Sequence, residues 1–315
     1  MSQLSSADYR GEVLAELIRD GVVESLHAGH LVILNGDGSL DIALGSPALP
    51  IFPRSSVKSL QASAMVRAGL KLNPEQLAVV CASHSGSEDH FRVIRSVLAT
   101  VGLDESALRC ATGLPLGKAE LADWGDKPAT RLSMNCSGKH AGMIATCVIN
   151  GWDIENYVDP QHPLQQAIQR EIEAMADEKL GNIAADGCGA PLFSISTTGL
   201  ARAINVLTTS IDPVHQEVIT AVRANPIMIA GITRTDTRLM EAVPGLFMKG
   251  GAEGVQVMSL PDGRTAAYKF ADGSSRADGV VAHSILKRWG IDAPSERVDV
   301  LGGGKVVGEI RSVLA

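Results

Sequence analysis

Apolar and polar positions alternate in two stretches of the chain, one near each end, in the way that is typical of β-hairpins. The first stretch covers residues 21–45 and contains an Asn-Gly-Asp-Gly turn at 35–38. The second covers residues 254–270 and contains a Pro-Asp-Gly turn at 261–263. We therefore expect paired strands at both ends of the chain.

Between the two hairpins, apolar residues recur at helical spacing. The pattern predicts helices at residues 90–101, 140–149, 164–176, 201–207 and 214–224. A further helix is predicted at 276–289, followed by a short strand at 306–313.

Strands at both ends with helices between them predict an α+β fold (an α/β sandwich), in which one antiparallel sheet from both chain ends is covered by helices. We expect a single compact unit over residues 1–315. Its sheet lobe would comprise residues 1–52 plus 240–315, and its mainly helical lobe residues 53–239. The cleft between the lobes is where a functional site is expected.

Composition narrows the classes of function. The chain of 315 residues has a formal net charge of −7 and 3% aromatic residues, so the clustered basic surface of a nucleic-acid-binding protein is not expected. No apolar run of about 18 residues predicts a membrane span, and the polar segment 1–10 lacks the apolar core of a signal peptide. Five cysteines, an odd number in a large chain, indicate reduced thiols and a cytoplasmic location.

Ser55 and Lys58 form the first candidate for chemistry, at the predicted start of a helix. A serine hydroxyl becomes a nucleophile when a base takes its proton, and a lysine can be that base if burial lowers its pKa. One helical turn separates the two residues, so both would face the same way. Such pairs also arise by chance, and we interpret the second one, Ser284 and Lys287, as the surface of an amphipathic helix.

Ser83 is the second candidate. The apolar stretch 77–80, predicted as a buried strand, leads into the polar loop 81–87. A loop at the end of a buried strand often presents a hydroxyl to a cleft. Ser85 and Ser87 are interpreted instead as caps of the following helix.

Lys249, followed by Gly250 and Gly251, is the third candidate and stands just before the second hairpin. The glycines would let a substrate approach the strand backbone. Penicillin-recognising serine enzymes carry Ser-x-x-Lys, a second serine and Lys-x-Gly in this chain order. The Ser-Asp-Asn element of those enzymes is missing here.

Cys136 and Cys188 stand in polar, glycine-containing loops and are candidate thiolate ligands for zinc. Lys139 or His140 could add a third ligand, although a lysine must lose its proton to bind a metal. The alternative interpretation, buried free cysteines, is the one we give to the three in apolar surroundings, Cys81, Cys110 and Cys147.

Together these motifs resemble the Rhizobium etli-type asparaginases, the asparaginase II family. The most specific stretches are 54–58, 81–85, 135–140 and 186–188, in this order along the chain. The resemblance implies a fold similar to serine β-lactamases and glutaminases. It also implies hydrolysis of L-asparagine to L-aspartate and ammonia by a homodimer.

The resemblance further implies roles for individual residues. It gives two Ser-Lys pairs, Ser55 with Lys58 and Ser83 with Lys249. It places one zinc ion per chain, outside the hydrolytic centre, on Cys136, Lys139 and Cys188, with Asp186 beside the ion. The residues expected to contact the substrate are Arg54, His84, Asn135, Asp186 and Gly250.

The resulting hypothesis is an acyl-enzyme reaction. Ser55 would attack the side-chain amide carbon while neutral Lys58 accepts its proton, and Ser83, tuned by Lys249, would relay a proton to the leaving ammonia. Which serine attacks stays open, because each has a lysine available. The rival functions are a cytoplasmic serine amidohydrolase for another small amide, similar to a glutaminase, and a non-enzymatic module that binds zinc or an amide.

Overall fold

The computed structural model describes Tyr9 and residues 11–314, so most of the polar segment 1–10 lies outside the described residues. Its main sheet takes three strands from the N-terminal part of the chain, β1 (Glu12–Arg19), β2 (Val22–Leu34) and β3 (Leu40–Leu44). Five more come from the C-terminal part, β8 (Phe247–Gly251), β9 (Val255–Ser259), β10 (Thr265–Phe270), β11 (Val298–Gly302) and β12 (Lys305–Ser312).

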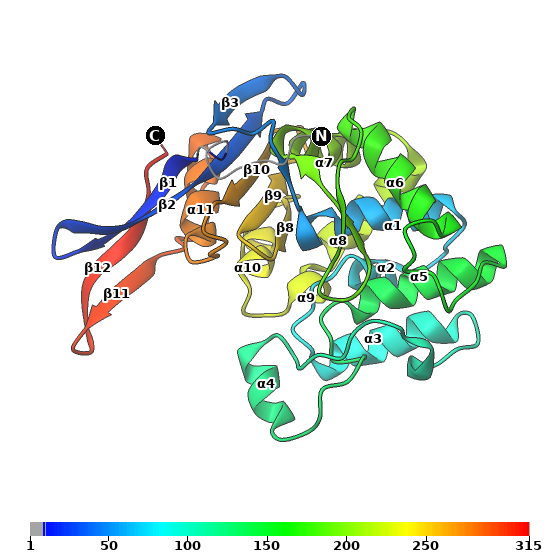
Figure 1. Cartoon of the computed structure of the whole chain (residues 1–315). Coiled ribbons are helices and arrows are strands. Elements are labelled where there is room, and N and C mark those ends of the chain that lie inside the picture. Colours follow the sequence, from blue (N-terminus) through cyan, green and yellow to red (C-terminus); the bar gives the residue numbers. More distant parts are fainter. Residues whose placement is uncertain (1–8, 10, 315) are drawn as a thin grey trace.

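The strand order is β11-β12-β1-β2-β10-β9-β8, with β3 beside β2, and all pairs are antiparallel (Figure 1). Strand β2 joins the two parts, because it pairs with β1 and β3 and also with β10. Both predicted hairpins are confirmed as β2–β3 and β9–β10. The expected antiparallel sheet from both chain ends is therefore confirmed.

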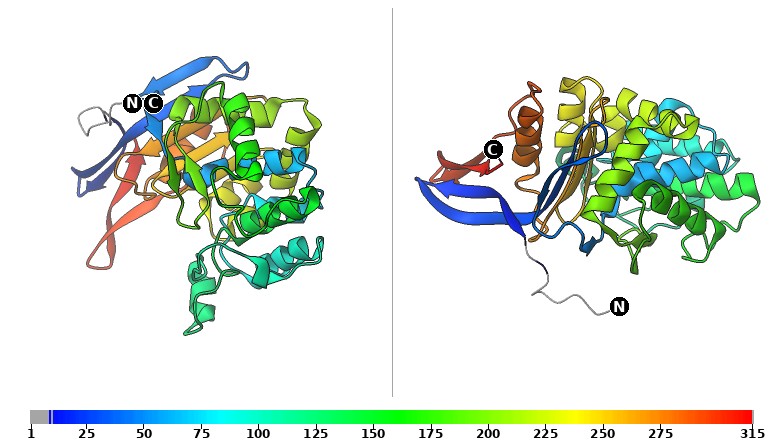
Figure 2. Two further views of the ribbon diagram at one scale, coloured as in Figure 1. Left: turned by 45° about the vertical axis from the view of Figure 1, so that its right-hand side comes forward. Right: turned by 90° about the horizontal axis from the view of Figure 1, so that it is seen from above.

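Helices cover the sheet on both faces (Figure 2). Helix α7 (Thr197–Thr209) packs on β2, β9 and β10, and most other helices of the middle of the chain lie on the same side of the sheet. Helix α11 (Asp278–Arg288) packs on β12 and β1 on the opposite side. The buried run 30–34 of β2 is consistent with a strand that is covered on both faces.

The middle of the chain is mainly helical. Its longer helices are α1 (Lys58–Arg67), α3 (Glu88–Ala99), α5 (Ser137–Asn150), α6 (Pro163–Ala176) and α8 (Pro213–Ala224). The shorter ones are α2 (Pro74–Val80), α4 (Lys118–Trp124), α9 (Pro226–Ala230) and α10 (Thr235–Ala242). Short strands complete it as two pairs, β4 (Pro50–Ile51) with β7 (Ile195–Ser196) and β5 (Ile183–Ala185) with β6 (Pro191–Phe193). The helices predicted from apolar spacing are all present, with ends shifted by a few residues.

The stretch 77–80 is helical, so its prediction as a strand is wrong. Asn73 caps α2: its side chain accepts a hydrogen bond from the Gln76 backbone N–H, and the Gln76 side chain accepts one from the Asn73 N–H. Pro74 at the first helical position adds a second start signal. These local signals outweigh the strand preference of two adjacent valines.

No helix in the described part of the chain is long and apolar enough to cross a membrane.

Candidate active site

The hydroxyl of Ser83 lies between two lysines. Lys58 Nζ and Lys249 Nζ each lie 3.1 Å from Ser83 Oγ, and all three side chains are buried. Each lysine is also held by a backbone oxygen, Lys58 by Ala82 and Lys249 by Gly250 at 2.7 Å. A hydroxyl can accept one hydrogen bond and donate another, so Ser83 can pass a proton between two amines.

The three residues come from separate elements. Lys58 is the first residue of α1, Ser83 follows α2, and Lys249 is in the middle of β8. The Ser83 backbone N–H donates to Ile229 O in α9 at 2.9 Å, which fixes the loop after α2 against the second half of the helical region.

Burial lowers the pKa of Lys249 to about 7; the Lys58 charge acts in the same direction, and Asp236 opposes the shift. A lysine that is partly neutral near pH 7 can accept a proton, so Lys249 has the property required of a general base.

Ser55 lies in a 3₁₀-helix (Arg54–Val57) that leads directly into α1. Arg54 has φ 53°, a left-handed conformation that is costly for a residue with a Cβ. Strand β8 approaches this turn closely: a Cβ on Gly251 would lie 2.7 Å from Pro53 O. Only glycine therefore fits at the end of β8, and the backbone around Ser55 is held in an unusual shape.

Ser55 and Ser83 line one pocket of about 340 Å³. Two of the residues expected to contact a substrate, Asn135 and Gly250, line it as well. The volume lies at the small end of the about 300–1,000 Å³ that is typical of small-molecule sites.

The other expected contact residues lie outside the pocket lining. His84 is completely buried, and its Nε2 is 2.8 Å from Ser137 Oγ. Arg54 Nε donates to Asp186 Oδ1 at 2.9 Å. The Lys58 backbone N–H donates to Ser55 O, but among the described residues no hydrogen bond joins the two side chains, because the Lys58 amine is directed to Ser83.

The predicted helix cap at Ser87 is confirmed: its side chain accepts from the His90 backbone N–H at the start of α3. Ser85 has another role, because its hydroxyl donates to Glu120 Oε1 in α4. Ser284 donates to Leu314 O, and Lys287 is exposed, as expected for a surface pair.

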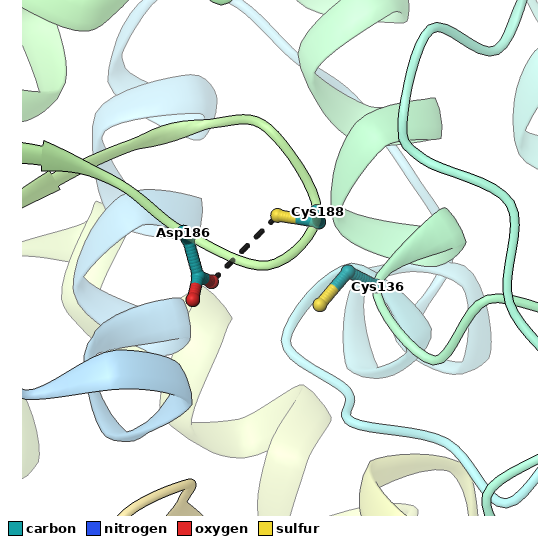
Figure 3. A group of neighbouring side chains, drawn as sticks. All are labelled: Cys136, Asp186 and Cys188. Atoms are coloured by element: carbon teal, nitrogen blue, oxygen red, sulfur yellow. Dashed lines mark hydrogen bonds between the residues drawn. The ribbon is translucent and has the colours of Figure 1, made fainter.

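A group able to hold a metal ion (Figure 3) lies next to Lys58, whose Nζ is 3.2 Å from Cys136 Sγ. The ligand atoms of Cys136, Asp186 and Cys188 all lie within 4.8 Å of one another. Lys139 Nζ lies 3.2 Å from Cys188 Sγ, so this amine could join the set. Two thiols with an amine or carboxylate form a donor set that suits zinc.

The cysteines of this group differ in acidity. The neighbouring Cys136 thiol, together with the Lys139 charge, lowers the pKa of Cys188 to about 5, whereas the pKa of Cys136 is raised to about 12 by the neighbouring Cys188 and by burial. Burial would lower the pKa of Lys139, but the adjacent Cys188 and Cys136 raise it overall. Both thiols must be deprotonated to bind a metal, and so must Lys139.

His140, the alternative to Lys139 as a third ligand, has a different partner. Its Nδ1 lies 2.6 Å from the Tyr157 hydroxyl, and burial lowers its pKa to about 3. Lys139 is therefore the residue of this pair that reaches the sulfur atoms.

Several residues that line the pocket carry no motif and were not predicted from the sequence, and four of them have charged or amide side chains that bear on the site. They are Arg234, Asp236, Gln256 and Asp278. Asp236 shapes the pocket wall, because its Oδ2 accepts the Gly250 N–H at 2.9 Å and its Oδ1 accepts Gln256 Nε2 at 2.8 Å.

In a comparison with known families, a sequence profile described as L-asparaginase II matches residues 15–312. Comparison with curated protein sequences gives no match.

Comparison with solved structures finds a protein named Mglu in its native form, at 14% identity and a TM-score of 0.45, with 82% of this chain and 63% of that chain covered. A second Mglu structure matches at 13% identity and a TM-score of 0.48, over 87% of this chain and 69% of that chain. A Bacillus glutaminase in 4.3 M NaCl matches at 13% identity and a TM-score of 0.36, over 84% of this chain and 91% of that chain. The chain thus spans 63% of the length of the native Mglu chain.

Proposed function

Because the chain belongs to the L-asparaginase II family, we propose that it is an amidohydrolase that converts L-asparagine to L-aspartate and ammonia. The observation that supports this most strongly is the Ser83 hydroxyl held between Lys58 and Lys249 at the pocket. A carboxamide is a poor electrophile with a poor leaving group, so its hydrolysis requires an activated nucleophile and a proton for the departing nitrogen. Buried lysines around a serine can provide both.

In the proposed first step, Ser55 Oγ attacks the side-chain amide carbon. Its proton passes to Ser83 Oγ, and the Ser83 proton passes to neutral Lys249 Nζ. Ser55 is suited to attack because it is only partly buried, lines the pocket and has no hydrogen-bond partner for its hydroxyl among the described residues. Ser83, with an amine on each side, is better suited to relay a proton. Hydrogen bonds of this kind often form fully only when substrate is bound.

The tetrahedral intermediate then collapses. The C–N bond breaks, the amide nitrogen takes back the proton through Ser83, and ammonia leaves an aspartyl ester on Ser55. Water attacks this ester and gives its proton to Lys249 through Ser83. The ester C–O bond then breaks, the proton returns to Ser55 Oγ by the same path, and aspartate is released with Ser55 and neutral Lys249 restored. Backbone N–H groups near Ser55 would stabilise the oxyanion, an effect of about 3–4 kcal/mol per donor in enzymes where it has been measured.

We also propose that Cys136, Lys139 and Cys188 hold one zinc ion, with Asp186 beside it. When bound, the ion would supply a fixed positive charge that orients the site. Two contacts connect the metal group to the Ser-Lys residues. Asp186 accepts a hydrogen bond from Arg54, which precedes Ser55, and Cys136 accepts one from Lys58 at 3.2 Å. Without the ion, the Cys136 thiol donates a hydrogen bond to Asn135 Oδ1 at 3.0 Å, and this bond is lost when Cys136 is deprotonated to bind the metal.

Ammonia release from L-asparagine and from L-glutamine tests the proposal, with wild type compared with Ser55→Ala and Ser83→Ala. Ser284→Ala is the matched control, because it removes the serine of the surface Ser-x-x-Lys pair. We expect selective release from asparagine, full activity in the control and loss in both site variants. Mass spectrometry of quenched reactions should detect the aspartyl ester in wild type and not in Ser55→Ala.

Two results would overturn the proposal. If both site variants keep wild-type activity, the two serines do not take part in the reaction. If ammonia is released faster from glutamine than from asparagine, glutamine is the substrate instead.

A cytoplasmic location and a homodimer, both expected from the sequence, are further parts of this proposal. Light scattering of the purified protein tests the second directly.

A further inference from the structure

Two charged residues of the pocket, Arg234 and Asp278, have no role in the chemistry described above. Both line the pocket that contains Ser55 and Ser83. Arg234 immediately precedes α10, and Asp278 is the first residue of α11, so the two come from separate parts of the chain.

Neither charged group has a hydrogen-bond or ion-pair partner in the part of the chain that the structure describes. The Arg234 guanidinium is half-buried and makes no hydrogen bond or ion pair with any residue that the structure describes. The Oδ1 atom of Asp278 is fully buried and also lacks a hydrogen-bond partner. A buried polar atom without a partner costs free energy, and sites that bind ligands are where such atoms are expected.

Electrostatics connects the two residues. Burial raises the pKa of the Asp278 carboxyl well above its usual range, Asp236 adds to the rise, and the positive charge of Arg234 opposes it. A cation bound at Asp278 would replace the missing hydrogen-bond donor and favour the charged carboxylate.

The other two acidic residues of the pocket already have partners. Both oxygens of Asp236 accept hydrogen bonds, from Gly250 and Gln256. Glu253 is exposed and lies 3.7 Å from Arg54. Arg234 is therefore available to bind an anionic group of a ligand, and Asp278 is available to bind a cationic one.

We propose that Arg234 binds the α-carboxylate and Asp278 the α-ammonium of the substrate. The pocket would then select free α-amino acids with a side-chain amide, and reject peptides and simple amides. This inference rests on the proposed function, because it places the scissile amide at Ser55 and Ser83. The rejection arises because a ligand that lacks one charged group leaves Arg234 or Asp278 unpaired.

Three amides test the inference. Succinamic acid is asparagine without the α-ammonium, and 3-aminopropanamide is asparagine without the α-carboxylate. We expect wild type to prefer asparagine over each by at least about 100-fold in kcat/KM. In Asp278→Asn the preference over succinamic acid should fall at least about tenfold, and in Arg234→Gln the preference over 3-aminopropanamide should fall by a similar factor.

Arg238→Gln is the matched control, because Arg238 pairs with Glu296 and does not line the pocket. It should keep both preferences. Each variant's melting temperature and circular dichroism are compared with wild type, and Asp278→Ala and Arg234→Lys serve as second variants if a first one does not fold.

A binding measurement separates this inference from the proposed function. L-Aspartate is titrated calorimetrically into Ser55→Ala and into the same variant with Asp278→Asn or Arg234→Gln. Weaker binding in both double variants supports the inference even if wild type releases no ammonia. Unchanged affinity, or unchanged substrate preferences in an active enzyme, would overturn it.

Discussion

Lys58 lies between the two parts of the site: its Nζ is 3.2 Å from Cys136 Sγ and also contacts Ser83 Oγ. A candidate metal ligand thus shares a hydrogen-bond partner with a candidate proton relay. Because Lys58 contacts both atoms, we expect a change at the sulfur atom to affect the lysine, and the metal group and the Ser-Lys group to respond together.

Metal removal is the first prediction. Chelation should lower both kcat and the melting temperature, and added zinc should restore both, because a metal that binds only the folded protein stabilises it. Cys136→Ser should lower the zinc content and the activity, whereas Cys147→Ala, a buried cysteine of α5, should leave both near wild type. Metal analysis alongside the ammonia assay checks this, and full kcat in metal-free protein would contradict it.

The pH dependence is the second prediction. The pKa of Lys249 is lowered to about 7, so the neutral base is populated above this pH and lost below it. The value of kcat/KM should therefore rise as pH increases through about 7 and then level off.

Variants of Lys249 provide the check. Lys249→Arg carries a permanent charge and should lose about 10²–10⁴-fold in kcat at every pH, in line with the usual contribution of a general base. If kcat/KM of the wild type is constant between about pH 5.5 and about pH 9, which spans the Lys249 pKa by roughly 1.5–2 units on each side, Lys249 is not the general base.

The third prediction concerns the left-handed backbone before Ser55. Arg54→Gly and Arg54→Ala both remove the ion pair with Asp186, but only glycine adopts φ 53° without strain. The alanine variant should be less stable than the glycine variant by about 1 kcal/mol, measured by denaturant unfolding. Equal stabilities would mean that the turn relaxes when the ion pair is absent.

The fourth prediction concerns the cap that positions Ser83. Asn73→Ala should lower the free energy of unfolding by about 1 kcal/mol, because it leaves backbone N–H groups of α2 without an acceptor. Glu75→Ala, which removes an exposed ion pair with Arg92 and a first-turn carboxylate but leaves the cap in place, should cost less. If the two losses are equal, the cap is not what holds α2.

The sheet and most helices could be predicted because their signals are local. The hairpin turns and the helical spacing of apolar residues are each contained within a short window of sequence. Strand β1 was missed because its pattern is weak and its pairing with β12 involves residues from the other end of the chain.

The pairing within the site depends on tertiary structure. Spacing alone puts Lys58 with Ser55, but the backbone changes from a 3₁₀-helix to an α-helix between them, and the amine extends to Ser83. Arg234 and Asp278 carry no motif at all. Only the fold shows that they share a pocket with the serines.

The pairing of β2 with β10 has a consequence for synthesis of the protein on the ribosome. Leu34 pairs with Thr265, which is synthesised much later. At about 5–20 residues per second, β2 therefore lacks this neighbouring strand for roughly 10–50 s. During this time an apolar strand edge is open to other chains. Newly made protein should therefore depend on chaperones, and rapid overproduction should favour inclusion bodies.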